Sequence, residues 1–432
     1  MKINGWNTGQ ANTENASLII HFIDVKIHCI LTVQIYIFHM RSDSIQRLLP
    51  VPKRSFFLFG PRSVGKSTWV RNKMPDAFVL DLLDSSLFLE LSQQPSRLEA
   101  MIGGRKKGSW VVLDEIQKIP ALLDEVHRLM ELRGWRFVLC GSSARKLRRS
   151  GTNLLAGRAL SRHLGPFSFA ELGDSFSLDF SLEWGLLPIV QTDRKHSRDI
   201  LSAYVNTYIK EEIREEGAIR NLAPFLRFLG IAGLMNGQSV NGQNISREAA
   251  VPRSSVDSYF SILEDTLLGH FLPAYRPRVK VREQAHPKFY WFDTGVARAA
   301  AGLLFDPADR LWKGVALETL IFHELRTYNE IKQKHRQIFY YRTASGVEID
   351  FLIETRKALH GAPPRVVTIE VKLSEKWDRK WEQPMRSLQQ LNGIKIERMF
   401  GVYMGPRSYD FGGLQVLPVT EFLKQLYAGK VY

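Results

Sequence analysis

The sequence predicts an α/β protein in which two α/β units flank a mainly helical region. Between residues 55 and 140, short apolar runs alternate with helical patterns, which is typical of a mostly parallel sheet. Residues 199–235 follow a helical pattern alone, whereas from about residue 310 a helix precedes three strands and a further helix. The length of 432 residues also exceeds that of a single core, so several domains are expected.

The charge and the cysteine content narrow the class of protein. A net charge of +15 favours two partner hypotheses, nucleic acid and an anionic membrane surface, and charge alone does not choose between them. Cys29 and Cys140 are too few and too far apart in the sequence for a disulfide framework or a zinc site. We therefore expect a reducing, cytoplasmic setting.

The N-terminal residues 1–47 are expected to form an atypical extension, with Met40 as the working start of the protein. Residues 16–40 are rich in apolar side chains, but charged residues and histidines interrupt them. A membrane helix needs roughly 20 mostly apolar residues, and a signal peptide needs a basic start and a small-residue cleavage site. Neither pattern is met, and a membrane-associating segment is the alternative.

A phosphate-binding motif follows the first apolar run. The run ends at Phe59, and residues 60–67, Gly-Pro-Arg-Ser-Val-Gly-Lys-Ser, fit the P-loop pattern in full. Gly60 and Gly65 let backbone N–H groups face the phosphates at the start of a helix. We therefore expect ATP and Mg²⁺ as cofactors. In this prediction Lys66 reaches the β- and γ-phosphates, Ser67 coordinates Mg²⁺ and Thr68 contacts the α-phosphate.

Two later strands are predicted to complete the nucleotide site. The apolar run 110–113 ends in Asp114 and Glu115, and unpaired carboxylates after a buried strand are costly unless they serve a function. We expect Asp114 near the metal and Glu115 where it can polarise water. The run 137–140 is followed by Ser142, which can sense the γ-phosphate.

Residues 243–292 predict a winged helix-turn-helix, with a short helix, a longer helix and two strands joined by a basic loop. Such a loop can lie along a phosphate backbone, and protein contact is the alternative. The acidic stretch Glu211 to Glu216 is expected to form a solvated face. The candidate DNA contacts are Arg276, Arg278, Lys280 and Arg282.

Two strand patterns near the C-terminus place charged side chains on a common face. Alternation puts Asp350, Glu370 and Lys372 opposite the apolar residues of these strands. Glu318 can join them from the preceding helix, where its neighbours are apolar. Such a cluster can hold Mg²⁺ and activate water for phosphodiester cleavage.

Several motifs together resemble the bacterial and archaeal AAA-type ATPases that carry a C-terminal domain of unknown function. The resemblance covers nearly everything after about residue 48 and implies an AAA-type P-loop sheet. In such domains an arginine often reaches the nucleotide of a neighbouring subunit, which makes Arg158 a catalytic candidate and a homo-oligomer a candidate assembly. The motifs are the P-loop, Leu-Asp-Glu-Ile-Gln at 113–117, Gly-Ser-Ser at 141–143, Leu-Ala-Gly-Arg at 155–158 and Gly-Pro-Phe-Ser-Phe-Ala-Glu-Leu at 165–172.

The C-terminal pattern resembles the PD-(D/E)xK nuclease fold. Asp350 and Glu370-Val-Lys372 stand at the motif positions and Glu318 at the helix acid. The proline that names the motif is absent, since Ile349 precedes Asp350. A scaffold that keeps this shape without cleaving is the alternative.

These inferences give a domain order and two functional hypotheses. The first hypothesis is an ATPase that couples hydrolysis to action on DNA. The alternative is a nucleotide-controlled DNA- or protein-binding switch whose nuclease-like domain is inactive. A membrane is not an expected partner. The predicted segments are the extension (1–47), the P-loop ATPase domain (48–175), a helical linker region (176–235), the winged helix-turn-helix (236–300) and the nuclease-like α/β domain (301–432).

Overall fold

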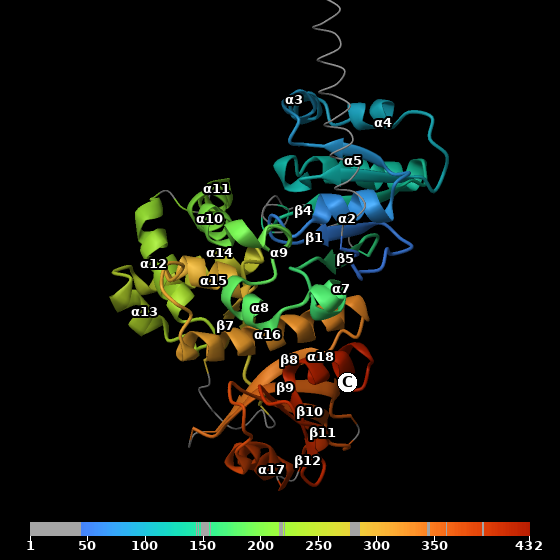
Figure 1. The fold of residues 1–432 in the computed structure, drawn as a ribbon. Coiled ribbons are helices and arrows are strands. Elements are labelled where there is room, and N and C mark those ends of the chain that lie inside the picture. The colour runs from blue at the N-terminus through green and yellow to red at the C-terminus, as the bar shows by residue number, and fades with distance from the viewer. Residues whose placement is uncertain are drawn as a thin grey trace, which may run out of the picture. The chain divides into compact units, whose positions relative to one another are not determined.

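The computed structural model describes most of the chain after residue 44. The described residues are 45–143, 145, 147, 155, 157–215, 219, 221–276, 286–343, 346–359, 361–390 and 393–432. The chain divides into two units, residues 1–47 and 48–432. Every element below belongs to the second unit (Figure 1). Residues 1–44 of the predicted extension, including Met40, lie outside the described residues.

The first sheet has five parallel strands in the order β2-β3-β4-β1-β5. The predicted parallel sheet is confirmed, and its first four strands overlap the predicted apolar runs. The fifth strand was not predicted, because its sequence Leu-Ser-Arg-His holds one apolar residue and is largely exposed. The strands are β1 (Phe56–Phe59), β2 (Phe78–Asp81), β3 (Trp110–Asp114), β4 (Arg136–Gly141) and β5 (Leu160–His163).

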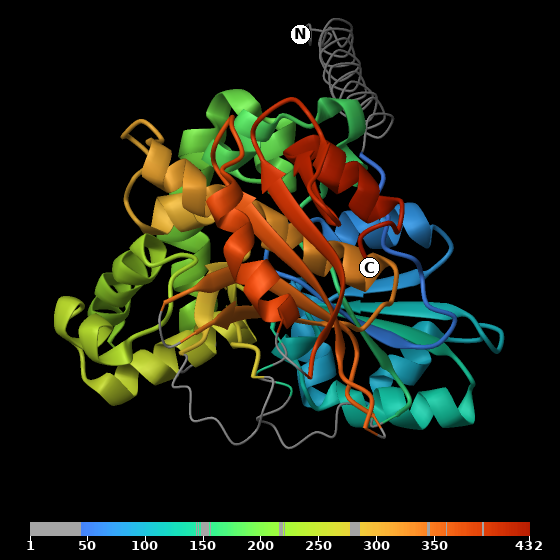
Figure 2. The same cartoon turned by 90° about the horizontal axis from the view of Figure 1, so that it is seen from below.

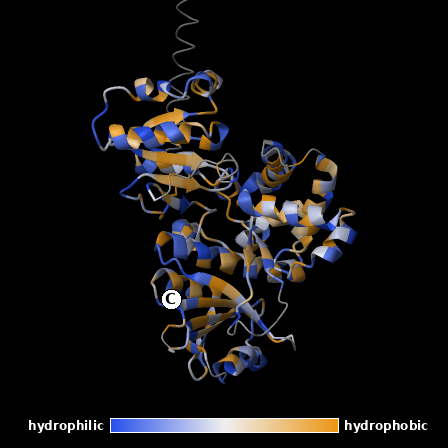
Figure 3. Cartoon of the chain, turned by 180° about the vertical axis from the view of Figure 1, so that it is seen from behind, coloured by the Kyte–Doolittle hydropathy of each residue, from blue (hydrophilic) through white to orange (hydrophobic). Residues whose placement is uncertain are grey.

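Helices cover this sheet and bury its apolar side chains. Phe57, Val111 and Leu113 from the strands share one core cluster with Leu122 and Val126 from a helix. The strands are mainly hydrophobic in Figure 3, as expected for a parallel sheet with both faces covered. The helices are α2 (Lys66–Lys73), α3 (Ser85–Gln93), α4 (Arg97–Ile102) and α5 (Leu122–Leu132).

A helical region follows the sheet, and the helical pattern of residues 199–235 is present in it. The expected solvated face at Glu211 to Glu216 is wrong for Glu212, which is buried, whereas Glu211 is exposed. The elements are α7 (Phe169–Leu172), α8 (Leu178–Trp184), α9 (Pro188–Thr192), α10 (Ser197–Ala203), a π-helix (Tyr204–Ile209), α11 (Lys210–Glu215) and α12 (Leu222–Leu234).

Next come two helices and a two-stranded antiparallel hairpin, in the order predicted for residues 243–292. The assignment of this unit as a winged helix stays a prediction. The loop 277–285 lies outside the described residues, and Arg278, Lys280 and Arg282 lie in it. The elements are α13 (Gly242–Glu248), α14 (Arg253–Asp265), β6 (Gly269–Leu272) and β7 (Lys288–Trp291), followed by α15 (Thr294–Ala300).

The C-terminal part is built on a mixed six-stranded sheet in the order β12-β13-β11-β10-β9-β8 (Figure 2). The pairs β8–β9, β9–β10 and β12–β13 are antiparallel, whereas β10–β11 and β11–β13 are parallel. The elements are α16 (Arg310–Ile331), β8 (Gln337–Arg342), β9 (Glu348–Arg356), β10 (Arg365–Lys372), α17 (Gln383–Gln390), β11 (Lys395–Tyr403), β12 (Tyr409–Asp410), β13 (Leu414–Pro418) and α18 (Val419–Tyr427).

Helix α16 is bonded to segments on both sides of it in the sequence. Thr319 accepts a hydrogen bond from the amide of Asn236 at 2.9 Å. The buried carboxyl of Glu324 accepts one from the backbone N–H of Phe169 and one from the hydroxyl of Tyr427, both at 2.7 Å. Within the described part of the chain, every helix is too short or too polar to cross a membrane.

Candidate nucleotide site

The chain turns from β1 into α2 over residues 60–65. Two positions of this turn, Gly60 and Gly65, suit glycine better than any other residue. A Cβ atom on Gly60 would lie 2.2 Å from the carbonyl oxygen of Leu164, far inside contact distance. Gly65 caps α2 with φ at +86°, a left-handed conformation that costs a side-chain-bearing residue energy. The two glycines therefore permit a tight loop whose end is the N-terminus of a helix, which favours bound anions.

The Lys66 ammonium lies over this loop. The residue is buried, and its Nζ donates hydrogen bonds to the carbonyl oxygens of Gly60 at 2.7 Å and Pro61 at 3.2 Å. Both acceptors are neutral carbonyl oxygens of the loop itself. The ammonium is thus held at the mouth of the loop, next to the backbone N–H groups of the helix start.

Ser67 and Asp114 meet at the carboxyl edge of the sheet. The hydroxyl of Ser67 donates a hydrogen bond of 2.7 Å to the Asp114 carboxylate, across 47 positions of sequence. A hydroxyl and a carboxylate are oxygen ligands of the kind Mg²⁺ takes. Thr68 is exposed and contacts Arg71 at 3.5 Å.

Glu115 follows β3 in a strained backbone conformation. Its φ of 58° is unusual for a residue with a side chain. Backbone strain of this kind is often found at functional sites. Burial is the main cause of an upward shift in the pKa of Glu115, and Lys66 opposes it. The amide of Gln117 donates a hydrogen bond to the Glu115 carboxylate. The backbone turn and this bond fix the carboxylate beside Asp114.

Ser142 joins the same edge from the end of β4, and it contacts residues that the sequence reasoning missed. Its Oγ accepts a hydrogen bond of 3.0 Å from Gln117 Nε2 and donates one of 2.6 Å to Glu212. Glu212 also forms an ion pair with Arg62 of the P-loop, at 2.5 Å. One sequence feature could have identified Glu212 as buried: it lies between Ile209 and Ile213, which are buried on the apolar face of the helix.

Arg158 lies away from the nucleotide site of its own chain. It precedes β5, whose start pairs with the start of β1, so it lies at the edge opposite the P-loop. Its exposed guanidinium forms an ion pair of 2.8 Å with Glu131. If Arg158 has a catalytic role, it would therefore act on the nucleotide of a neighbouring subunit, and this stays a prediction.

The predicted nuclease-like residues come together in the C-terminal sheet. The Lys372 ammonium lies 2.5 Å from Glu370 and 3.6 Å from Asp350. Asp350 also accepts a hydrogen bond of 2.8 Å from the backbone N–H of Val371. Asp350 and Glu370 are buried on the antiparallel strands β9 and β10, as the alternation of side chains predicted.

Glu318 completes this group from α16, and it brings an unpredicted lysine. Its carboxylate accepts a hydrogen bond of 3.1 Å from Tyr290 and lies 3.9 Å from the buried ammonium of Lys288. Burial, and then the charge of Asp350, raise the pKa of Glu318 to about 7 and that of Glu370 to about 8. Among the described residues, no three histidine, cysteine or acidic side chains are grouped so as to hold a metal ion.

Of the predicted DNA contacts, the structure describes Arg276, which is exposed just after β6. Lys288, at the other end of the same loop, faces the carboxylates of Glu318 and Glu348 and not solvent. Contact between this loop and DNA stays a prediction.

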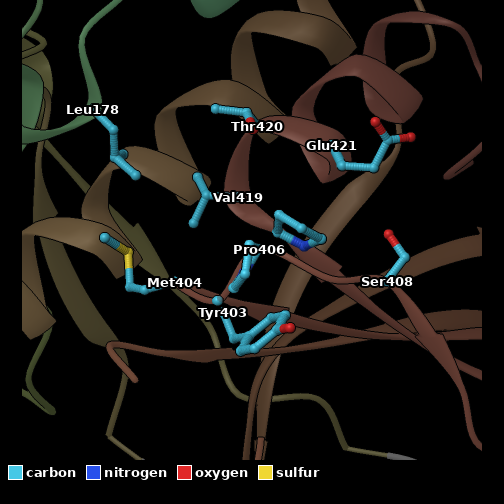
Figure 4. Close-up of a pocket in the computed structure, with 10 residues that line it drawn as sticks. Leu178, Tyr403, Met404, Pro406, Ser408, Val419, Thr420 and Glu421 are labelled. Carbon is cyan, nitrogen blue, oxygen red and sulfur yellow. The ribbon is translucent and has the colours of Figure 1, made fainter. Parts of the chain in front are cut away.

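A separate cavity of about 470 Å³ lies between β11, β13 and α18 (Figure 4). Tyr403, Ser408 and Glu421 supply polar groups, and Leu178, Met404 and Val419 supply apolar ones. Its lining includes none of the predicted site residues and no basic side chain. The cavity is therefore distinct from the nucleotide site and from the acidic cluster.

The chain shows only a low similarity to known proteins over its whole length. No curated protein matches the sequence. Among solved structures, the chain is similar to a signal transduction ATPase with numerous domains from Pyrococcus horikoshii, which has a tetratricopeptide repeat sensor. The two share 11% identity with a TM-score of 0.20, over 65% of this chain and 46% of that one. The chain thus spans less than half the length of that protein.

Family matches are more specific and divide the chain into three segments. Residues 52–173 match an AAA domain. Residues 175–306 match a domain of unknown function (DUF8612), and residues 313–422 match another (DUF4143). The chain therefore contains an AAA-type P-loop ATPase domain that is followed by two domains of unknown function.

Proposed function

We propose that the chain binds ATP with Mg²⁺ and hydrolyses it at the carboxyl edge of the first sheet. The hydrogen bond between Ser67 and Asp114 supports this most directly. P-loop enzymes hold Mg²⁺ through a P-loop hydroxyl and a carboxylate at the end of a nearby strand. These two side chains come from distant parts of the sequence and meet beside Lys66 and Glu115.

The neighbouring groups have complementary roles in this proposal. Lys66 exchanges its carbonyl acceptors for oxygens of the β- and γ-phosphates, where its charge stabilises the negative charge of the transition state. Glu115 orients the attacking water and accepts its proton. Its raised pKa brings it closer to the neutral range in which a general base is most effective.

ATP turnover measured with and without Mg²⁺ tests this function. We expect phosphate release that requires Mg²⁺, and we expect DNA, single- or double-stranded, to change its rate if the positive charge serves DNA binding. Turnover that proceeds equally well in a chelator would contradict the assignment of Ser67 and Asp114.

Arg158 is proposed to act on the nucleotide of a neighbouring subunit. Arg158→Ala should then leave ATP affinity nearly intact and lower turnover at least about tenfold, because a guanidinium stabilises charge on the γ-phosphate oxygens. Mixing this variant with Glu115→Gln subunits should restore part of the turnover, since some interfaces pair both intact residues. No recovery in demonstrated mixed assemblies would exclude action between subunits. Arg162 is the nearest competitor for this role, and a loss of turnover in Arg162→Ala together with wild-type turnover in Arg158→Ala would assign the role to Arg162.

A second candidate function is phosphodiester cleavage in the C-terminal domain, which the grouping of Asp350, Glu370 and Lys372 favours. Two carboxylates can bind Mg²⁺ together with phosphate oxygens of a substrate, and the bound metal can then activate water. The rival is a nucleotide-controlled binding switch in which the same cluster only maintains the shape of the domain.

We expect Glu370→Ala to abolish any Mg²⁺- or Mn²⁺-dependent cleavage of plasmid or oligonucleotide DNA without changing ATP turnover. Glu354→Ala, which removes a carboxylate from the same sheet outside the cluster, is the control and should cleave like the wild type. Equal cleavage by wild type and Glu370→Ala would assign the activity to a contaminant. DNA binding without cleavage by the wild type would favour the switch.

A further inference from the structure

Glu212 carries a carboxylate from the helical region into the proposed ATP site. Its Oε1 accepts a hydrogen bond of 2.6 Å from the Ser142 hydroxyl. Its Oε2 lies 2.5 Å from Nε of Arg62. Glu212 is 7% exposed, and both of its partners belong to the ATPase domain: Arg62 lies within the P-loop, and Ser142 directly follows β4. A buried carboxylate of α11 is thus held against the loop that would bind phosphate.

The same carboxylate is linked to the proposed catalytic base. Ser142 accepts a hydrogen bond from Gln117, whose amide also donates to Glu115. Hydrogen bonds therefore run without a gap from α11 to the residue that would orient water.

The two groups that hold Glu212, a hydroxyl and a guanidinium, are of the kind that also bind phosphate oxygens. Hydroxyl and guanidinium groups form charge-assisted hydrogen bonds with phosphate oxygens as they do with carboxylates. Two anions in a partly buried site repel each other and cannot both keep the same donors. ADP lacks the γ-phosphate and would leave the contact of Glu212 with Ser142 and Arg62 undisturbed.

We propose that Glu212 competes with the γ-phosphate of ATP for Ser142 and Arg62, so that ATP, unlike ADP, displaces α11 from the P-loop. This inference rests on the proposed ATP-binding function and adds a sensing residue to it. Displacement frees Ser142 for the γ-phosphate and allows Gln117 to reposition Glu115. Glu212 acts through these residues and is a positioning residue.

The segment before α11 supplies a second contact that would move with it. The Tyr204 hydroxyl donates a hydrogen bond of 3.0 Å to the carbonyl oxygen of Arg62. Tyr204 begins a π-helical turn, an irregular helix form that is frequent at functional sites. Its ring also packs against Phe292, just after β7, at 6.2 Å between centroids. Displacement of α11 would therefore reach the β6–β7 hairpin.

The test compares nucleotide affinities of Glu212→Gln and Glu211→Gln, each measured by titration with ADP and with a non-hydrolysable ATP analogue. Glu211 is the matched control, because its exposed carboxylate lies 4.0 Å from Arg62 and makes no contact with Ser142 that the structure shows. We expect Glu212→Gln to bind the ATP analogue about five- to tenfold more tightly, since a repulsive charge is removed. Its ADP affinity, and both affinities of Glu211→Gln, should change less than about twofold.

Hydrogen exchange of the unmodified protein gives a second measurement that does not depend on a variant folding. Amides of residues 204–215 should exchange faster with the ATP analogue and Mg²⁺ than with ADP and Mg²⁺. Two outcomes would overturn the inference about Glu212: an unchanged ratio of ATP to ADP affinity in Glu212→Gln, or equal exchange with both nucleotides. The proposed ATP-binding function would still stand if Lys66→Ala abolishes ATP binding. Failure of the wild type to bind ATP would overturn the proposed function, and the inference with it.

Discussion

Glu115→Gln is expected to keep ATP bound and to lower turnover by at least about 100-fold, the usual contribution of a positioned general base. The amide has the size of the carboxylate but cannot accept a proton from water. Lys66→Ala should instead abolish measurable ATP binding, because the buried ammonium over the P-loop is lost.

The two variants separate binding from chemistry, and they require two measurements on each protein: nucleotide affinity at equilibrium and phosphate release at saturating ATP. Lys73→Ala, at the far end of α2, is the matched control for loss of a lysine and should behave like the wild type. Equal loss of ATP affinity in Glu115→Gln and Lys66→Ala would contradict the division of roles.

Glu324→Gln is expected to make the protein more stable than the wild type at alkaline pH. Burial raises the pKa of Glu324 to about 8, and the hydrogen bonds from Tyr427 and Phe169 only partly oppose it. The unfolded chain releases this proton near pH 4.5, so between that pH and about 8 the folded state binds more protons than the unfolded state. The free energy of unfolding of the wild type therefore falls as the pH rises, by at most about 1.4 kcal/mol per pH unit from this group.

A neutral glutamine has no proton to lose, so its stability relative to the wild type should increase from pH 6 to pH 8 and then level off. Melting temperatures of the two proteins across this range measure the difference. Glu375→Gln, at an exposed position, should follow the wild type at every pH. Parallel curves for Glu324→Gln and the wild type would show that the Glu324 carboxyl does not titrate differently in the folded state.

The parts of the nucleotide site that were predicted from sequence depend on short-range patterns. An apolar strand, a glycine-containing loop and a lysine are adjacent in sequence, and Asp114 directly follows a buried strand. The shared carboxyl edge of a parallel sheet then implies that Ser67 and Asp114 meet, and the structure brings them to 2.7 Å.

The parts that were missed depend on pairing over long distances. Glu212 reaches Ser142 across 70 positions, and nothing in an acidic stretch distinguishes the one carboxylate that turns inward except its apolar neighbours. Strand β5 is largely exposed and is held by its pairing with β1. Gln117 stands within a motif that was recognised, but its bonds to Glu115 and Ser142 depend on how the chain turns after β3.

Helix α16 also determines where the chain can be divided. Its first turn starts the C-terminal sheet domain in sequence, but the amide of Asn236 and the backbone of Phe169 bond to its side chains from outside that domain. A fragment that began at the helix would leave Thr319 and the Glu324 carboxyl without these partners, on surfaces built to be covered. We therefore expect the segment from residue 310 onward to be less stable on its own than in the whole chain, because it would lose these hydrogen bonds.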